Sequence, residues 1–138
     1  NEFYWASNGK GAWCNNKRIR VSKRQDFSSC LIGTGTPFGE RIYINYYKEL
    51  ENISKLTAGI RRLGAASIDL AYVASGKIDG FWQKDLNLWD VSSGVLLIKE
   101  AGGRLSEPDG KNWTTKSKNI LASNSLVHDK LIENLTLL

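Results

Sequence analysis

The alternation of strand and helix patterns after residue 28 restricts the fold of this chain more than any other feature of its sequence. Short apolar runs that are typical of buried strands alternate there with segments whose apolar residues recur every three or four positions. Strands are predicted at residues 29–33, 59–63, 78–82 and 119–122 and from Leu105, and helices over 42–56, 66–75 and 127–135, with a further helix capped at Asp90 and stopped at Gly102. Such alternation predicts a layered α/β domain.

The opening residues follow a different pattern. Short apolar runs at residues 3–6, 12–14 and 19–21 are separated by turns rich in glycine and asparagine. This pattern predicts a meander of short antiparallel strands. The sequence contains no methionine and begins with strand-like alternation. We therefore expect that it starts within a sheet and that a preceding part of the protein is absent.

Composition restricts the class of protein further. The chain is 41% hydrophobic and 24% charged, as expected for one globular domain, and no apolar run approaches the ~20 residues of a membrane span. No signal or transit segment is recognisable at its start. Cys14 and Cys30 lack a CxxC spacing and fit a reducing cytoplasm better than a disulfide scaffold. His128, the single histidine, lies in a polar context and is predicted to be at the surface, which leaves no set of zinc ligands.

Asp90 precedes a run of small and apolar residues, and two roles are open for it. As the N-cap of a buried helix, its carboxylate would accept the free amide hydrogens of Ser92 or Ser93 and stabilise the helix by about 1 kcal/mol. Small residues, however, let a ligand approach a helix end closely. Helix N-termini attract anions, and a carboxylate there can share a metal ion with a bound anion. The second role is therefore that of a metal ligand.

Three other stretches resemble motifs of known chemistry. Residues 33–40, GTGTPFGE, lack the ending and the spacing of phosphate-binding loops, and residues 107–111, EPDGK, are predicted to form a turn. The segment from Lys10 to Arg24 carries six basic residues and no acid. A solvated strand face is the simpler interpretation of this segment. Nucleic-acid binding is the alternative, although Trp13 is the single aromatic residue within it for stacking on bases.

The stretch from Gly59 to Gly103 resembles the C-terminal half of the inositol monophosphatase family, and its bacterial inositol-1-monophosphatase branch in particular. The family patterns Ile-Arg-x-x-Gly-small-Ala, Gly-x-x-Asp-Gly-aromatic-Trp, Trp-Asp-x-small-small-Gly and Glu-Ala-Gly-Gly match residues 60–66, 76–82, 89–94 and 100–103. The opening stretch GKGAWCNNKRIRVS is similar to a hairpin of the same family. The resemblance covers most of the chain, from Phe3 to the final helix.

The resemblance implies a fold and an assembly. The family has a layered α-β-α-β-α sandwich, of which this chain would form mainly the C-terminal α/β domain. Residues 1–28 are then expected to be the final strands of the truncated N-terminal half, and residues 29–138 the C-terminal α/β domain. Members of the family are usually homodimers, so a second copy and the missing N-terminal half are expected partners of this chain. A cytoplasmic location and sensitivity to lithium are also implied.

The resemblance also implies a site. The aspartate of the Trp-Asp pattern is a catalytic metal ligand in the family, and this role falls to Asp90. Gly64, Ala65 and Ala66 match the segment whose backbone approaches the substrate ring. Gln83 stands where the family usually has a glutamate that contacts ring hydroxyls, and an amide there puts the preferred substrate in doubt. The implied metal is Mg²⁺, which one aspartate cannot hold alone, and the other ligands of the family lie upstream in the part that this chain lacks.

The implied reaction is Mg²⁺-dependent hydrolysis of a small phosphate monoester, with inositol monophosphate as the expected substrate. Fructose bisphosphate, a nucleotide 3′-phosphate or histidinol phosphate would be sister specificities of the same chemistry. Because it lacks the main metal-binding motif, the isolated 138-residue chain is expected to be inactive. The alternative function is that of a regulatory module associated with RNA polymerase or RNA, since some bacterial relatives act in transcription complexes. The basic segment from Lys10 to Arg24 is the feature that supports this alternative.

Overall fold

The computed structural model describes residues 1–36 and 45–136 of the chain. The strands within these ranges are β1 (Tyr4–Ser7), β2 (Gly11–Cys14), β3 (Lys17–Ile19), β4 (Leu31–Thr34), β5 (Gly59–Arg61), β6 (Gly80–Gln83), β7 (Arg104–Ser106) and β8 (Ile120–Ser123). The α-helices are α1 (Tyr46–Leu56), α2 (Ala66–Ala74), α3 (Leu88–Glu100) and α4 (His128–Thr136), and a 3-10 turn, η1 (Phe27–Ser29), precedes β4. Among the helices of these two ranges, none has both the length and the apolar character needed to cross a membrane.

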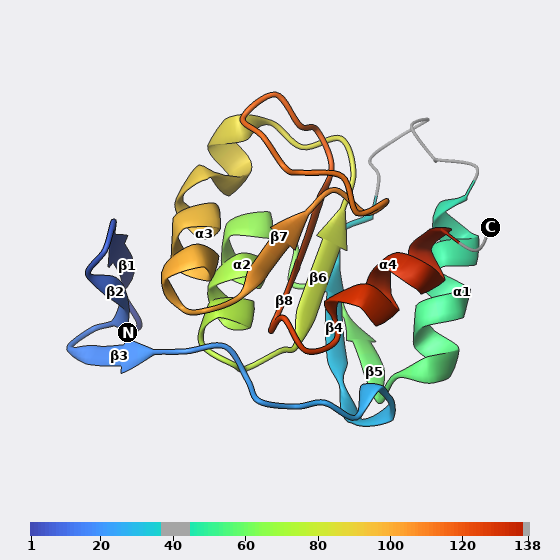
Figure 1. Cartoon of the computed structure of the whole chain (residues 1–138), viewed down its shortest axis with the longest axis horizontal. Helices are drawn as coiled ribbons and strands as arrows, with labels where there is room; N and C mark the ends of the chain where they lie inside the picture. Colours follow the sequence, from blue (N-terminus) through green and yellow to red (C-terminus); the bar gives the residue numbers. More distant parts are fainter. Residues whose placement is uncertain (37–44, 137–138) are drawn as a thin grey trace.

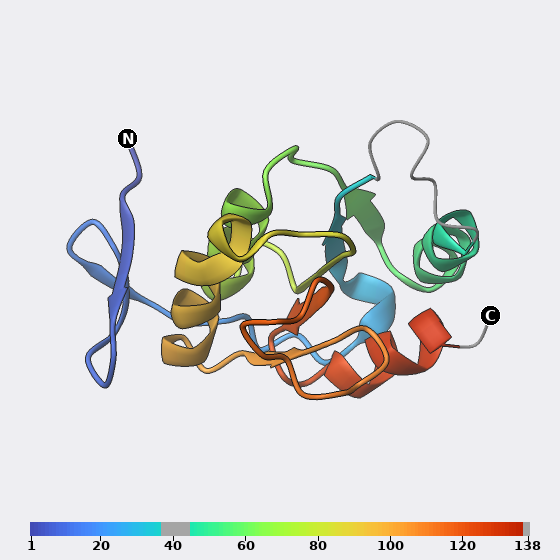
Figure 2. The same ribbon diagram turned by 90° about the horizontal axis from the view of Figure 1, so that it is seen from above.

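Sheets and helices alternate in four layers (Figure 1). The antiparallel sheet β1-β2-β3 forms one outer layer, and α2 and α3 separate it from a five-stranded sheet with the order β5-β4-β6-β8-β7. Figure 2 shows the same order of layers from above, with α1 and α4 on the far side of the larger sheet. β4 pairs in parallel with β5 and β6, whereas β8 runs antiparallel to β6 and β7. This arrangement confirms the α/β class and matches four consecutive layers of the expected sandwich.

Both faces of the five-stranded sheet are buried, which explains why its strands are apolar along most of their length. Phe81 and Trp82 are consecutive in β6 and therefore point to opposite faces. Phe81 packs under α2 and α3 with Leu70 and Ile98, and Trp82 packs under α1 and α4 with Leu131. None of these five side chains is more than 1% exposed. Each such side chain stabilises the fold by about 1.5–3 kcal/mol. Within the described residues, an apolar core lies on each side of the sheet.

The contact between α2 and α3 depends on a glycine. A Cβ placed on Gly94 of α3 would lie 2.5 Å from Cδ1 and 2.6 Å from Cβ of Leu70 in α2. Gly94 therefore lets the two helix axes approach closely, and a larger residue would force them apart at a cost of about 1–3 kcal/mol. Because the helices are held side by side, their N-termini lie at the same edge of the sheet (Figure 1).

The buried carboxylate of Asp79 connects the segment that follows the three-stranded sheet to the five-stranded sheet. Asp79 is 3% exposed and accepts hydrogen bonds from the Leu31 amide (2.8 Å) and the Ser22 hydroxyl (2.5 Å), with the Arg24 guanidinium at 3.4 Å. Asn124 donates to the Ser22 hydroxyl (2.9 Å) and to the Arg24 carbonyl (2.8 Å). Four separate segments of the chain therefore meet at Asp79, and both of its carboxylate oxygens have partners.

The third strand ends earlier than expected, and the expected start of the helix over 42–56 lies outside the described ranges. The third strand was expected at residues 19–21 but ends at Ile19, because Val21 leaves the sheet and donates its amide hydrogen to the carbonyl of Ala101 (3.1 Å). The helix expected over residues 42–56 is present as α1 from Tyr46, and residues 42–44 lie outside the described ranges.

The prediction that His128 lies at the surface is wrong, because this residue is fully buried at the start of α4. Its Nε2 lies 2.8 Å from the Ser106 hydroxyl, which in turn donates to the Glu107 carbonyl (2.7 Å). Its Nδ1 lies 2.8 Å from the Ser123 hydroxyl, which accepts the Ser125 amide hydrogen (3.2 Å). All of these groups are satisfied when the imidazole is neutral, donates from Nε2 and accepts at Nδ1.

Acid should therefore destabilise the fold through His128. Burial, assisted by the charge of Arg104, lowers the pKa of the imidazole from 6.5 to about 4. Stability that depends on the neutral ring is complete above pH 6.5 and is lost as the pH falls towards about 4. The shift corresponds to about 3 kcal/mol of unfolding free energy.

Urea unfolding at several pH values would measure this loss, with His128→Gln as the matched variant. Glutamine keeps a donor and an acceptor but does not titrate, so the variant should lose about 2–3 kcal/mol less than the parent across the same range. Equal losses in the two proteins would contradict a buried neutral imidazole.

Candidate functional site

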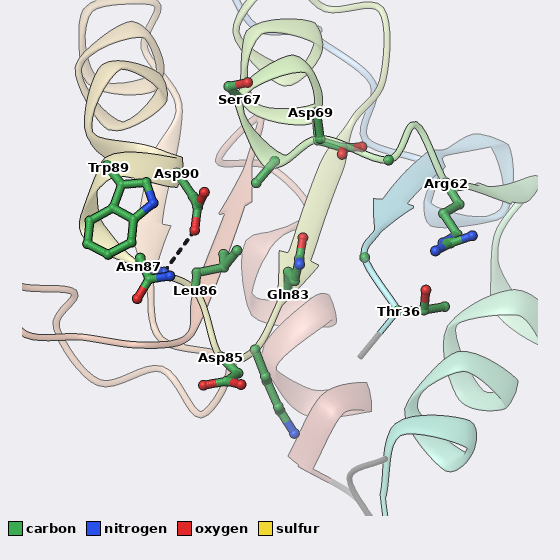
Figure 3. Close-up of a pocket in the computed structure, with 15 residues that line it drawn as sticks. Thr36, Arg62, Ser67, Asp69, Gln83, Asp85, Leu86, Asn87, Trp89 and Asp90 are labelled. Atoms are coloured by element: carbon green, nitrogen blue, oxygen red, sulfur yellow. Dashed lines mark hydrogen bonds between the residues drawn. The ribbon is translucent and has the colours of Figure 1, made fainter. Parts of the chain in front are cut away.

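A cavity of about 570 Å³ opens at the carboxyl ends of the parallel strands β4, β5 and β6, where α2 and α3 begin. In sheets of this kind, ligands bind at the carboxyl ends of the parallel strands. The lining residues, drawn in Figure 3, are Gly35, Thr36, Arg62, Gly64–Ser67, Asp69, Gln83–Asn87, Trp89 and Asp90. They come from segments that lie far apart in the sequence.

All five site residues that the sequence predicted line this cavity. The structure brings Gly64, Ala65 and Ala66 at the start of α2 together with Gln83 at the end of β6 and Asp90 in α3. In Figure 3, Asp90 lies on one side of the cavity, and Gln83 lies between it and the segment of β4.

Asp90 does not cap α3 in the way that the sequence suggested. The helix begins at Leu88, so Asn87 is the N-cap and Asp90 is the third residue of the helix. Its Oδ2 accepts the backbone amide hydrogen of Asn87 (3.0 Å), which is the reach-back bond of a capping box. The second carboxylate oxygen makes no hydrogen bond to the rest of the described chain. One oxygen thus stabilises the helix start, and the other is available to the cavity.

The start of α2 presents backbone donors to the cavity. Gly64 has a φ of +88°, a conformation that favours glycine, and the extended Ala65 then leads into the first turn of the helix. No side chain caps this N-terminus. The free amide hydrogens of the first turn and the positive end of the helix dipole therefore make this edge of the cavity suitable for an anion.

Gln83 is held against the backbone of β4. A Cβ on Gly35 would lie 2.1 Å from Oε1 and 2.6 Å from Nε2 of Gln83, so the side-chain amide occupies the space that another residue at position 35 would need. Because an amide both donates and accepts, Gln83 can bind a hydroxyl group in either direction.

Lys84, the next residue, points to the other side of the sheet. Its ammonium forms an ion pair with the carboxylate of Glu49, which is fully buried in α1. The indole Nε1 of Trp82 donates a second hydrogen bond to Glu49 (3.1 Å). This pair fixes α1 to the end of β6, directly beside the cavity. The sequence pattern placed Glu49 on the helix but gave no sign that it would be buried and paired.

Asp69 is a cavity residue that the sequence reasoning did not identify. It is 1% exposed, and its Oδ1 is buried without a hydrogen-bond partner. Burial raises the pKa of its carboxyl group to about 7. The helical spacing of the sequence could have identified this acid, because Asp69 shares the buried face of α2 with Ala66, Leu70 and Val73. An acid on such an apolar face needs a partner or a function.

The acids of the cavity do not amount to a metal site by themselves. Within residues 1–36 and 45–136, no three histidine, cysteine, aspartate or glutamate side chains are grouped closely enough to hold a metal ion. Magnesium requires an octahedral set of oxygen ligands and is bound through carboxylates, water and substrate oxygens. The described part of the chain therefore does not by itself fit a complete Mg²⁺ site.

Comparison with known proteins gives a consistent result along the whole chain. The sequence model of the inositol monophosphatase family matches residues 1–137 of the chain. The inositol-1-monophosphatase of Caulobacter vibrioides is 43% identical over 138 aligned residues, which cover 98% of this chain and 54% of that protein. The Nus factor SuhB of Pseudomonas aeruginosa is 43% identical over 127 residues, which cover 90% of this chain and 47% of that protein.

Solved structures agree with these sequences. The extragenic suppressor protein suhB of Bartonella henselae superposes with a TM-score of 0.94 at 41% identity, covering 99% of this chain and 52% of its own. The inositol monophosphatase of Anabaena gives a TM-score of 0.92 at 38% identity, covering 98% of this chain and 54% of its own. The chain spans about half the length of the relatives that it matches. It belongs to the inositol monophosphatase family, of which it represents the C-terminal portion.

Proposed function

We propose that this chain supplies one part of the active site of a phosphatase that hydrolyses a small phosphate monoester, with inositol monophosphate as the substrate. The observation that carries the proposal is the cavity in which Asp90, Gln83 and the uncapped start of α2 meet. The membership of the family supports the same reaction. The proposed domain boundary follows from this division, with residues 1–28 ending an N-terminal half and residues 29–138 forming the C-terminal domain.

Each part of the cavity has a proposed task. The free amide hydrogens at the start of α2 stabilise negative charge on the ester, and the backbone of Gly64, Ala65 and Ala66 lets the alcohol part of the substrate approach closely. Gln83 binds a hydroxyl of that alcohol. Asp90 would contribute its second oxygen as one ligand of Mg²⁺, and the remaining ligands would come from the N-terminal half of the full-length enzyme. Bound Mg²⁺ would lower the pKa of a water molecule and neutralise charge on the ester.

A second candidate function is binding of RNA in a transcription complex. Relatives named Nus factor SuhB support it, and so does the exposure of Lys17, Arg18, Arg20 and Lys23 along β3 and the segment after it. Salt-dependent binding of RNA by this chain, abolished by Arg18→Ala and Arg20→Ala, would favour this function. We also propose that the protein is a homodimer, which a measurement of its mass in solution would test.

The first test of the phosphatase function compares this chain with the full-length enzyme, meaning this chain together with the N-terminal half that its relatives possess. We expect the full-length enzyme to release phosphate from inositol monophosphate in the presence of Mg²⁺, and the 138-residue chain alone to release none. The reason is that the described chain carries Asp90 but no grouped set of metal ligands. Mg²⁺-dependent turnover by the purified chain alone would overturn the proposed division of the site.

Asp90→Asn in the full-length enzyme separates the two tasks of this side chain. Asparagine keeps an oxygen that can accept the Asn87 amide hydrogen, so the unfolding free energy should change by no more than about 1 kcal/mol. A neutral amide is a poor ligand for Mg²⁺, so phosphate release should fall at least about a hundredfold and half-activation should need more Mg²⁺. Asp129→Asn, which neutralises an exposed acid on α4 outside the cavity lining, is the control and should leave phosphate release and the Mg²⁺ requirement unchanged. Near-normal turnover with an unchanged Mg²⁺ requirement would reduce Asp90 to a helix-capping residue.

Gln83→Glu should alter selectivity rather than the reaction itself. Glutamate has nearly the same shape, and Gly35 leaves room for it, so the fold should tolerate the change. The carboxylate only accepts hydrogen bonds, whereas the amide also donates them. We expect the kcat/KM for inositol monophosphate to change by about tenfold relative to that for phenyl phosphate, which has no hydroxyl group. If both esters respond by the same factor, Gln83 does not contact the alcohol.

A further inference from the structure

Beside the cavity, two glycines leave part of one face of the β4 segment without side chains. Gly33 and Gly35 are two positions apart in and just after β4, so both would point their side chains to the face that α2 covers. A Cβ on Gly33 would lie 2.6 Å from Oδ1 of Asp69, and a Cβ on Gly35 would lie 2.1 Å from Oε1 of Gln83. A carboxyl group from α2 and an amide from β6 therefore lie over neighbouring parts of the same bare backbone.

Asp69 differs from the other buried acids of the described chain. Glu49 is bonded to Lys84 and Trp82, and Asp79 is bonded to backbone and side-chain donors. Each of these two acids holds separate elements of the fold together. The side chain of Asp69 is also buried, at 1% exposed, but one of its carboxyl oxygens has no hydrogen-bond partner. An unpaired buried polar group costs stability, so a structural role does not account for an acid at this position.

We propose that Asp69 is a specificity-determining residue of the phosphatase site, where it accepts a hydrogen bond from a hydroxyl of the alcohol part of the substrate. The inference rests on the proposed function and extends it by a second contact beside Gln83. Two residues along a strand span about 6.6 Å, and Asp69 and Gln83 contact the β4 segment at two positions with that spacing, Gly33 and Gly35. Hydroxyls on separate carbons of one polyol ring can reach both groups. The substrate class is therefore a polyhydroxylated cyclic alcohol phosphate rather than a simple ester.

The surroundings of Asp69 make its charge depend on a ligand. The strands β4, β6 and β8 carry no charged residue, and the other charged residues among those that line the cavity are Arg62, Lys84, Asp85 and Asp90, of which Lys84 directs its ammonium to Glu49 on the other face of the sheet. Burial alone raises the pKa of Asp69 to about 7. A hydroxyl that donates to the ionised form would lower this pKa again, because a charged acceptor makes the stronger hydrogen bond. By linkage, the polyol should bind more tightly as the pH rises through the pKa of the free group.

The test measures selectivity in the full-length enzyme with saturating Mg²⁺. The ratio of kcat/KM for inositol monophosphate to kcat/KM for phenyl phosphate cancels effects on the phosphate and on the metal. Asp69→Asn should lower this ratio about tenfold at about pH 8 and less than about threefold at about pH 6, because the parent carboxyl is neutral in acid. Asp69→Ala should lower it at both pH values and serves as a second variant in case one of the two does not fold. Asp129→Asn removes one exposed acid and should leave the ratio unchanged.

Each outcome decides between the inference and its alternatives. A ratio that keeps its parental value in the folded variants, with both esters slowed equally or not at all, would overturn the role of Asp69 and leave the phosphatase function standing. A loss that does not depend on pH in Asp69→Asn would also overturn it, since the carboxylate would then not be the acceptor. If the unsubstituted full-length enzyme hydrolyses neither ester, the proposed function fails and this inference fails with it.

Discussion

The close packing of α2 against α3 is the constraint on which the rest of this structure depends. Gly94 lets Leu70 approach α3 at a distance that no Cβ would permit, and both helices then fill the space between two sheets. Because the helices are parallel neighbours, their N-termini open at the same sheet edge. One packing contact therefore positions Asp90 and the uncapped start of α2 on two sides of the same cavity. The apolar core and the polar site are consequences of the same geometry.

The three buried acids of the described residues divide between fold and site. Asp79 and Glu49 use their charge for the fold, since each is bonded to donors from elements that it joins. Asp69 is as deeply buried and lines the cavity, but one of its carboxyl oxygens has no hydrogen-bond partner. Evolution of a stable interior normally removes such a group or gives it a partner, because it costs free energy in the absence of a ligand. The three acids are similarly buried, but only Asp69 has an oxygen without a hydrogen-bond partner. This difference supports a role for Asp69 other than stabilising the fold.

Most elements of the fold could be predicted from periodicity, because apolar spacing records which faces are buried. The strands and helices after residue 28 were found in this way, and the family motifs led to Gln83 and Asp90. Features that depend on which residues meet in the folded chain could not be predicted from local sequence patterns. His128 was expected at the surface, because its polar neighbours in sequence conceal the serines of β7 and β8 that bond its ring. The N-cap of α3 was misplaced, because Asp90 accepts a bond from Asn87 behind it rather than from the residues after it.

The geometry of Asp90 removes the conflict between its two proposed roles. A capping carboxylate and a metal-binding carboxylate are usually treated as alternatives, but a capping box uses one oxygen and leaves the other. The bond to Asn87 also restricts the rotamer, so the free oxygen is held in place before any ligand arrives, which reduces the entropy that binding would cost. If the proposed function holds, this chain would bind the alcohol part of the substrate through Asp69, Gln83 and the start of α2. It would share the metal ion with the other half of the enzyme. Substitutions in this chain could then change the preferred alcohol while the remaining metal ligands stay untouched, and family members with different substrates could share one hydrolytic chemistry.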